Sequence, residues 1–474
     1  MTSPAGRGDR RRFRAPTPMT RGRQRVEITA GPGLLFGSRP GESGHYGRLR
    51  RQRVESGFGG ATAGHACARH HHRGERDQGM AVQATIDPVG VNVSKSVFSI
   101  DGKQFTVETS ANVPLDRTGT PWLPPGVVVA MTTEQDLVLD TPVDPAALSG
   151  AEQARDLLRS WYPQLGTSSV VAPVTSPAAR EGGGVGCFFS GGLDAFYSVL
   201  KNRAEITHLI LVHGFDIDPR RPKPYERISA GARDVAAEMG VELIEIRTDL
   251  QFLHTKHGNN WASTAHGAAL AHVALLLSPH LRKVIVAASG SYDTGTLDPH
   301  GSHPDLDPLW SSGSVEIVQD GTEAGRVDKA EAIKDSDLAM RHLRVCNLAS
   351  DSEYNCGKCE KCIRTMINLY IAGGLERCET LPHTIPIERM NRMHVRSGAF
   401  PFATENLEAM RARGIHDAEL EAALQRILER TPRQQRILAY RWLLVEVAPR
   451  LPRVLIGLLV QRVRAMRSAP VSTC

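Results

Sequence analysis

The chain has 474 residues, of which 41% are hydrophobic and 23% are charged, which is enough for two or three domains with packed cores. Its formal net charge of +6 is unevenly placed, because residues 1–79 hold 16 Arg and 6 acidic residues and carry +10. The remainder holds 41 basic and 45 acidic residues and carries −4, so it offers no basic face for long nucleic acids and argues against a DNA-binding protein.

Residues 1–79 lack apolar periodicity and are rich in Gly, Arg and His, which predicts a disordered leader. A basic arm that grips RNA is one interpretation of this stretch. We prefer another, in which translation begins at Met80 and the leading stretch belongs to a mis-called start. No secretory hydrophobic region is visible, so we expect a cytoplasmic protein.

Residues 80–165 predict a small α+β module that shapes the substrate entrance or forms a homodimer contact. Two apolar runs flank Asp101-Gly102, which predicts a β-hairpin with a type I′ turn. Ser149-x-x-Glu152 predicts the cap of a helix that runs to about Trp161. The expected strands are Val97–Ile100, Gln104–Val107, Val127–Ala130 and Leu137–Leu139, and a linker follows over 167–183.

The segment Ser190-Gly191-Gly192-Leu193-Asp194 joins an apolar run that ends at Phe189 to a helical run that begins at Ala195. Two glycines leave backbone N–H groups exposed in one concavity, with no Cβ in the way. The positive end of the following helix faces the same concavity, so a phosphate is the natural ligand. A tight strand-to-helix turn with an ordinary cap is the alternative.

From this segment onward, short apolar runs alternate with amphipathic ones. This alternation predicts an α/β fold, with a parallel Rossmann-like sheet of about five strands and helices on both faces. Ligands of such sheets bind beyond the carboxyl ends of the strands, where the Ser190 turn lies. The later strands are expected at His208–His213, Val241–Ile246, Lys283–Ala288 and Val315–Val318, and the helices at Tyr225–Met239, Ser263–Leu277 and from about Asp328.

Other loops at these carboxyl ends supply candidate site residues. His213 ends the second strand, where it would contact a ligand or simply finish the strand as a polar residue. Ser289–Asp293 follows the fourth strand, and 301–310 is a Pro- and Asp-rich loop of the kind that is usually functional or disordered. Among the histidines of this region only His266, which follows Trp261, merits attention as a site residue.

Four cysteines form the pattern C-x9-C-x2-C-x2-C at Cys346, Cys356, Cys359 and Cys362. The last three curl around one point, and a fourth thiolate from a preceding loop completes a closed tetrahedral site of the structural-zinc type. Disulfides are disfavoured by this tight spacing and by the absence of a secretory signal. An iron–sulfur cluster is the competing interpretation. Cys187, inside the first strand of the sheet, is expected to be a buried, inert thiol.

The string from Phe189 to Asp194 resembles the pyrophosphate-binding loop, S-G-G-x-D-S, of the N-type ATP pyrophosphatases. This chain departs from the motif at Ala195, where the family has a second Ser. A four-cysteine zinc site later in the same domain resembles the 7-cyano-7-deazaguanine synthase branch of that superfamily, which favours zinc over an iron–sulfur cluster. The resemblance covers about residues 183–374.

The resemblance implies an enzyme that cleaves ATP to AMP and pyrophosphate and activates a carboxylate or amide of a small molecule, with ammonia or an amine as donor. Phe189, Ser190, Gly191, Gly192, Leu193 and Asp194 would bind the ATP phosphates with Mg²⁺. His213 would contact the nucleotide, and Zn²⁺ would be structural. Lys329, in Lys329-Ala330-Glu331, would act with Asp194 at the leaving group, although Asp328-x-x-Glu331 also resembles a helix cap.

Residues 375–474 predict a helical extension, with amphipathic helices at Asp417–Arg430 and Pro432–Val447. The apolar run Val454–Val460 is too short to span a membrane and would pack on the protein or lie on a membrane surface. Two other functions remain open: a tRNA-modifying adenylating enzyme, which needs a basic groove, and a nucleotide-binding protein that has lost catalysis, for which Ala195 is the argument.

Overall fold

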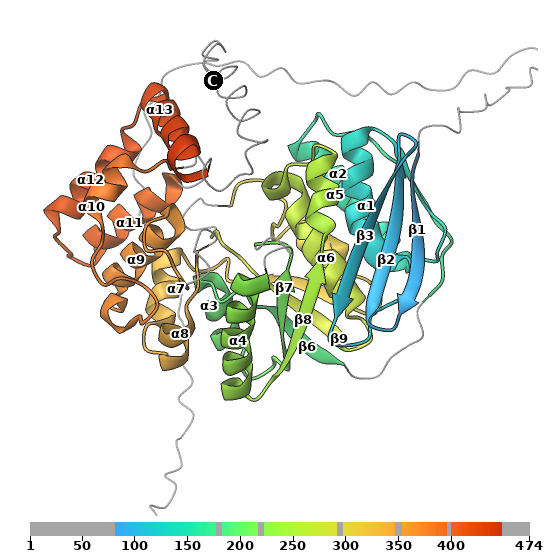
Figure 1. The fold of residues 1–474 in the computed structure, drawn as a ribbon, viewed down its shortest axis with the longest axis horizontal. Coiled ribbons are helices and arrows are strands. Elements are labelled where there is room, and N and C mark those ends of the chain that lie inside the picture. Colours follow the sequence, from blue (N-terminus) through green and yellow to red (C-terminus); the bar gives the residue numbers. More distant parts are fainter. Residues whose placement is uncertain are drawn as a thin grey trace, which may run out of the picture. The chain divides into compact units, whose positions relative to one another are not determined.

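The structure is a computed structural model that describes residues 81–176, 183–216, 222–291, 297–346, 353–395 and 400–447 (Figure 1). The predicted leader, the linker residues 177–182 and the apolar run Val454–Val460 lie outside the described residues. The described chain has an α/β fold built on a mixed, mostly parallel sheet, as the alternation of apolar runs predicted.

The sheet has ten strands in the order β10-β9-β6-β7-β8-β3-β2-β1-β4-β5, where the prediction was a parallel sheet of about five strands and a separate amino-terminal module. The block from β10 to β8 is parallel, whereas β3 pairs antiparallel with β8 and continues the sheet into the amino-terminal strands. These strands therefore extend the main sheet (blue in Figure 1). The strands are β1 Ala81–Gly90, β2 Val93–Ile100, β3 Lys103–Ala111, β4 Asp136–Leu139, β5 Val170–Val171, β6 Gly184–Phe188, β7 His208–His213, β8 Glu242–Thr248, β9 Leu281–Ala287 and β10 Glu316–Asp320.

The predicted hairpin is confirmed by β2 and β3, which pair antiparallel from Val93 opposite Ser110 to Ile100 opposite Lys103. Asp101 and Gly102 form the turn with φ of 50° and 70°. Two successive positive φ angles define the type I′ turn, whose twist matches that of the strands it joins.

Two predictions in the amino-terminal part are wrong. Val127–Ala130 is not a strand but the middle of helix α1, Leu123–Thr133, in which every residue from 123 to 131 is buried. A helix buried on all sides has no period that separates it from a buried strand, and Pro124 and Pro125 suit its first turn. Ser149 lies inside α2, Pro145–Trp161, whose cap is the Asp144 carboxylate accepting from the Ala147 amide; the predicted end at Trp161 is confirmed.

Helices cover both faces of the sheet, because strand residues alternate between two apolar cores. In β6, Phe188 belongs to the core with α1, α2, α5 and α6, whereas Val185 and Cys187 belong to the core with α3, α4, α7, α8 and α9. β6 lies between β7 and β9, at the centre of the parallel block. These helices are α3 Leu193–Lys201, α4 Pro222–Met239, α5 Leu250–Lys256, α6 His266–Leu276, α7 Arg326–Ile333, α8 Asp337–His342 and α9 Glu360–Ala372.

The carboxyl-terminal part is helical as predicted, and it packs an apolar core against the outer side of α9. Asp417 caps the predicted helix there, with its carboxylate accepting from the Leu420 amide. No helix within the described ranges is both long and apolar enough to cross a bilayer. The elements are α10 Ile387–Arg392, α11 Phe400–Ala412, α12 Ala418–Leu428 and α13 Pro432–Trp442.

Candidate functional site

The glycine turn lies at the carboxyl end of β6, in the centre of the parallel block. Gly191 has φ of +76°, a conformation that favours glycine, and Gly192 caps α3 with extended backbone. Phe189 and Leu193 are buried and anchor the turn, whereas Ser190 is exposed. The strand, the turn and the helix therefore stand where the sequence placed them, at the edge where α/β sheets bind ligands.

The turn is held from one side by Arg344. The Arg344 amide donates to the Gly191 carbonyl at 2.7 Å, and its guanidinium Nη1 donates to the Ser190 carbonyl at 3.4 Å. The Ser190 hydroxyl accepts weakly from the Gly192 amide at 3.3 Å. The contact with Arg344 could not be predicted from the sequence of the turn, because Arg344 lies about 150 residues further along the chain.

Asp194, in the first turn of α3, faces two buried cations. Its Oδ2 accepts from Arg326 Nη1 at 2.6 Å, and its Oδ1 lies 3.7 Å from Lys329 Nζ. Burial raises the pKa of Asp194, but the charges of Arg326 and Lys329 outweigh burial and lower it below the ordinary value. The two predicted catalytic residues are thus brought together, and Arg326 is a third member that sequence reasoning missed.

Lys329 is almost fully enclosed, and its ammonium donates to the Ala288 carbonyl at 2.6 Å. Burial lowers the pKa of Lys329, and Asp194 partly restores it. The capping alternative for this segment is wrong: α7 begins at Arg326 after the cap Gly325, so Asp328 lies within the helix.

Residues of the carboxyl-terminal part support this charge cluster. The guanidinium groups of Arg326 and Arg364 lie 5.8 Å and 4.3 Å from the Phe402 ring centre, and Glu405 accepts from the Val327 amide at 3.2 Å. Arg364 also borders a pocket of about 30 Å³ between α9, α11 and α12, room for one or two water molecules and far too small for a nucleotide.

Two other candidate residues, His213 and His266, make separate aromatic contacts. His213, the last residue of β7, is buried and stacks on Tyr225 with ring centres 4.0 Å apart. Beyond it, Phe215, Trp261 and His266 form a chain of ring contacts at 5.2 and 5.5 Å. Burial lowers the pKa of His266 to about 4, which keeps the imidazole neutral near pH 7. The Ser289–Asp293 candidate lies partly outside the described residues.

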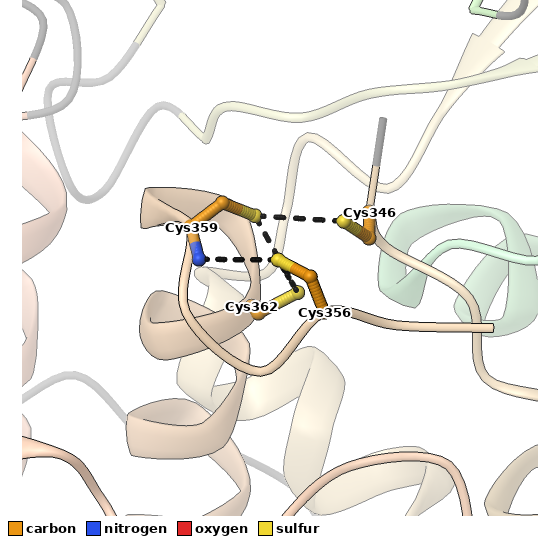
Figure 2. Close-up of side chains that lie close together, drawn as sticks. All are labelled: Cys346, Cys356, Cys359 and Cys362. Carbon is orange, nitrogen blue, oxygen red and sulfur yellow. Dashed lines mark hydrogen bonds between the residues drawn. The ribbon is translucent and has the colours of Figure 1, made fainter. Parts of the chain in front are cut away.

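The four predicted cysteines converge on one point, as Figure 2 shows. Their sulfur atoms all lie within 4.8 Å of one another, with contacts of 3.4 Å (Cys359–Cys362), 3.8 Å (Cys346–Cys359) and 3.9 Å (Cys356–Cys362). Four thiolates around one tetrahedral Zn²⁺ with bonds of about 2.3 Å would stand about 3.8 Å apart. The spacing fits a single ion and is far longer than a disulfide bond of about 2.05 Å.

The backbone around Cys356 favours its thiolate. Cys356 Sγ accepts from the Cys359 amide at 3.3 Å and from the Lys358 amide at 3.5 Å. Hydrogen bonds from the other thiols, Cys346 first, and from the Lys358 amide lower the pKa of Cys356 well below its ordinary value. Cys359 caps α9, so the positive end of that helix also faces the sulfur atoms.

Asn355 ties the two cysteine segments together. Its Oδ1 accepts from the amides of Val345 and Cys346 at 2.9 and 3.2 Å, and its Nδ2 donates to the Leu343 carbonyl at 2.8 Å. Asn355 precedes Cys356, so it locks the segment of the first ligand onto the segment of the other three. Outside this cluster, Cys187 is buried in β6 and burial raises its pKa, which confirms the expected buried thiol.

Comparison of the chain with protein-family models, with curated proteins and with solved structures gave no match.

Proposed function

We propose that this protein is an ATP-dependent enzyme of the N-type ATP pyrophosphatase kind, similar to the 7-cyano-7-deazaguanine synthases. It would cleave ATP to AMP and pyrophosphate to activate a carboxylate or amide of a small molecule for attack by ammonia or an amine. The observation that carries the proposal is the glycine turn at the carboxyl end of β6, beside the Asp194, Arg326 and Lys329 cluster. The four-cysteine site of the same unit supports it.

The residues fit a polyphosphate with its magnesium ion. Gly191 and Gly192 leave the mouth of the turn without side chains, and α3 directs its positive end toward it. Asp194 Oδ1 makes no hydrogen bond and faces Lys329 Nζ at 3.7 Å, so this carboxylate would exchange that ion pair for one with a magnesium ion. Lys329 would stabilise negative charge on the leaving pyrophosphate, and His213 would border the nucleotide. Magnesium would neutralise phosphate charge, and zinc would only stabilise the fold.

A second function, nucleotide binding without catalysis, is favoured by one specific observation. Ala195 stands where the resembled motif has Ser, and its side chain is buried in the first turn of α3. The backbone donors of the turn survive this difference, whereas one hydroxyl near the phosphates is lost. Turnover that appears only in Ala195→Ser would select this second function.

The test follows the products of ATP. Purified protein, loaded with zinc and supplied with Mg²⁺, is incubated with ATP labelled at the α- and γ-phosphates and with a metabolite extract plus ammonium. AMP and pyrophosphate are the expected products, and they should disappear in Lys329→Met. ADP and phosphate would contradict the proposal, as would the absence of any heat of ATP binding in calorimetry.

A further inference from the structure

Arg344 bridges the glycine turn and the four-cysteine site. Toward the turn, its amide and its Nη1 donate to the carbonyls of Gly191 and Ser190. Toward the cysteines, its Nη2 donates to the Cys346 carbonyl at 3.1 Å. The side chain is buried, so these contacts form in a packed setting where a lost hydrogen bond is costly.

These contacts determine where the turn directs its amides. A trans peptide unit is planar, and its C=O and N–H groups point in opposite directions. The carbonyls of Ser190 and Gly191 both point at Arg344. The N–H groups of Gly191 and Gly192, which belong to the same two peptide units, therefore point away from Arg344. Arg344 thus orients both N–H groups toward the opposite side of the turn, where the Gly192 amide also donates weakly to the Ser190 hydroxyl at 3.3 Å.

The position of Arg344 depends in turn on the cysteines. Cys346 follows it by two residues, and Asn355 holds the backbone from Leu343 to Cys346 through three hydrogen bonds. Asn355 is bonded covalently to Cys356. A metal ion bound by both Cys346 and Cys356 would therefore add a second link between the Asn355 segment and the segment that carries Arg344, and would restrain the position of Arg344.

We propose that Arg344 is a positioning residue that couples the metal site to nucleotide binding, so that zinc and ATP each raise the affinity for the other. This inference rests on the proposed function, because it needs a nucleotide at the glycine turn. The linkage is reciprocal, so one factor describes both effects. Coupling between sites in proteins is commonly about 5- to 150-fold, and we expect a value in this range.

The experiment measures the linkage directly on the full chain. Zinc affinity is determined by competition with a chromophoric chelator, with and without saturating Mg²⁺ and a non-hydrolysable ATP analogue. Affinity for the same analogue is determined by calorimetry on zinc-loaded and partly depleted protein. We expect the analogue to tighten zinc binding, and zinc to tighten analogue binding by the same factor.

Variants separate positioning from simple charge. In Arg344→Lys the positive charge remains, but one ammonium group cannot reproduce the planar guanidinium that holds the carbonyls of Ser190 and Cys346 together. The factor by which zinc and the analogue raise each other's affinity should therefore fall toward one. Asn355→Ala removes the hydrogen bonds that hold the Arg344 segment, none of which involves the glycine turn. This variant should nevertheless also reduce the linkage between zinc and the analogue. Arg341→Ala removes an exposed arginine that pairs with Glu238 at 2.6 Å, and it should behave as wild type. Circular dichroism and zinc content confirm that each variant is folded.

The outcomes are distinct. Wild-type protein that binds zinc and the analogue with no linkage would overturn the coupling and leave the proposed function intact. Full linkage in Arg344→Lys would show that charge alone suffices and would overturn the positioning role. Zinc-loaded wild-type protein that binds no ATP analogue would refute the proposed function itself.

Discussion

Replacing Asp194 by Asn tests whether the negative charge of Asp194 stabilises the fold by compensating the buried charges of Arg326 and Lys329. Asp194 lies 2.6 Å from Arg326 Nη1 and 3.7 Å from Lys329 Nζ. At an effective dielectric constant of 20, these separations correspond to attractions of about 4 to 6 kcal/mol each, before the cost of removing the charges from water. Removing one partner of a buried ion pair costs about 3–5 kcal/mol. We expect a loss of this size in the free energy of unfolding of Asp194→Asn.

In Asp194→Asn the charges of Arg326 and Lys329 are left uncompensated, which leads to a second expectation. Pyrophosphate bound at the turn would supply the missing negative charge, so it should stabilise Asp194→Asn more than wild type. At a hundredfold excess over its dissociation constant, a ligand stabilises a protein by about 2.7 kcal/mol. The difference between variant and wild type should appear in urea unfolding with and without pyrophosphate, in magnesium-free buffer.

The matched control is Asp337→Asn, which breaks an exposed ion pair with Arg377 at 2.7 Å, where water and salt screen the charges. It should change stability little and should not alter the pyrophosphate effect. Unfolding of Asp194→Asn at the wild-type urea concentration would contradict a stabilising charge balance at this cluster. Equal stabilisation of both proteins by pyrophosphate would place the anion away from the Arg326 and Lys329 charges.

Three further predictions concern the metal, the turn and acid stability. Elemental analysis should find about one zinc per chain, lost in Cys356→Ser, and a brown iron-containing preparation would contradict the zinc assignment. Gly191→Ala places a side chain at φ of +76°, at a cost of about 1–2 kcal/mol, and should weaken ATP binding in calorimetry; unchanged affinity would exclude the turn as the phosphate site. His272 is buried in α6, with its Nδ1 2.7 Å from the Pro121 carbonyl oxygen. Burial lowers the pKa of His272 from 6.5 to about 4, so its contribution to stability is complete above pH 6.5 and is lost as the pH falls toward 4. That loss should reach about 3 kcal/mol in urea unfolding and should shrink in His272→Gln; an unchanged pH dependence would contradict it.

The parallel strands and the turn could be predicted because their signals are local. β7 was placed residue for residue, since a short apolar run between polar turns leaves little freedom. The cysteine cluster was equally accessible, because three of its four ligands lie within seven residues. The extension of the sheet through β3 and β8 was not accessible, since that pairing joins segments about 140 residues apart.

The charge partners of the turn were missed for the same reason. Arg326 is 132 residues from Asp194, and Arg344 is 154 residues from Ser190. An arginine at either position looks like an ordinary polar residue of a helix or loop until the fold brings it to the carboxyl end of β6. The local sequence therefore predicted which residues form the turn, but not which distant residues hold it.

What holds the turn also explains why a metal site is useful here. Between the end of α8 at His342 and the start of α9 at Glu360, the described residues form neither helix nor strand. The described residues of this segment must nevertheless present Arg344 to the turn, and they lack the helix or strand hydrogen bonds that would hold them in place. A tetrahedral ion at the four cysteines would replace them with four metal–sulfur bonds.

Local hydrogen exchange can test this argument, because it reports the opening of one segment independently of the rest. Chelation of zinc should increase exchange at the described residues between 343 and 359 and at Gly191 and Gly192. Exchange at the β6–β9 pairing should change little, because those hydrogen bonds do not depend on Arg344. Uniform acceleration across the sheet would mean that zinc stabilises the whole fold rather than the support of the turn.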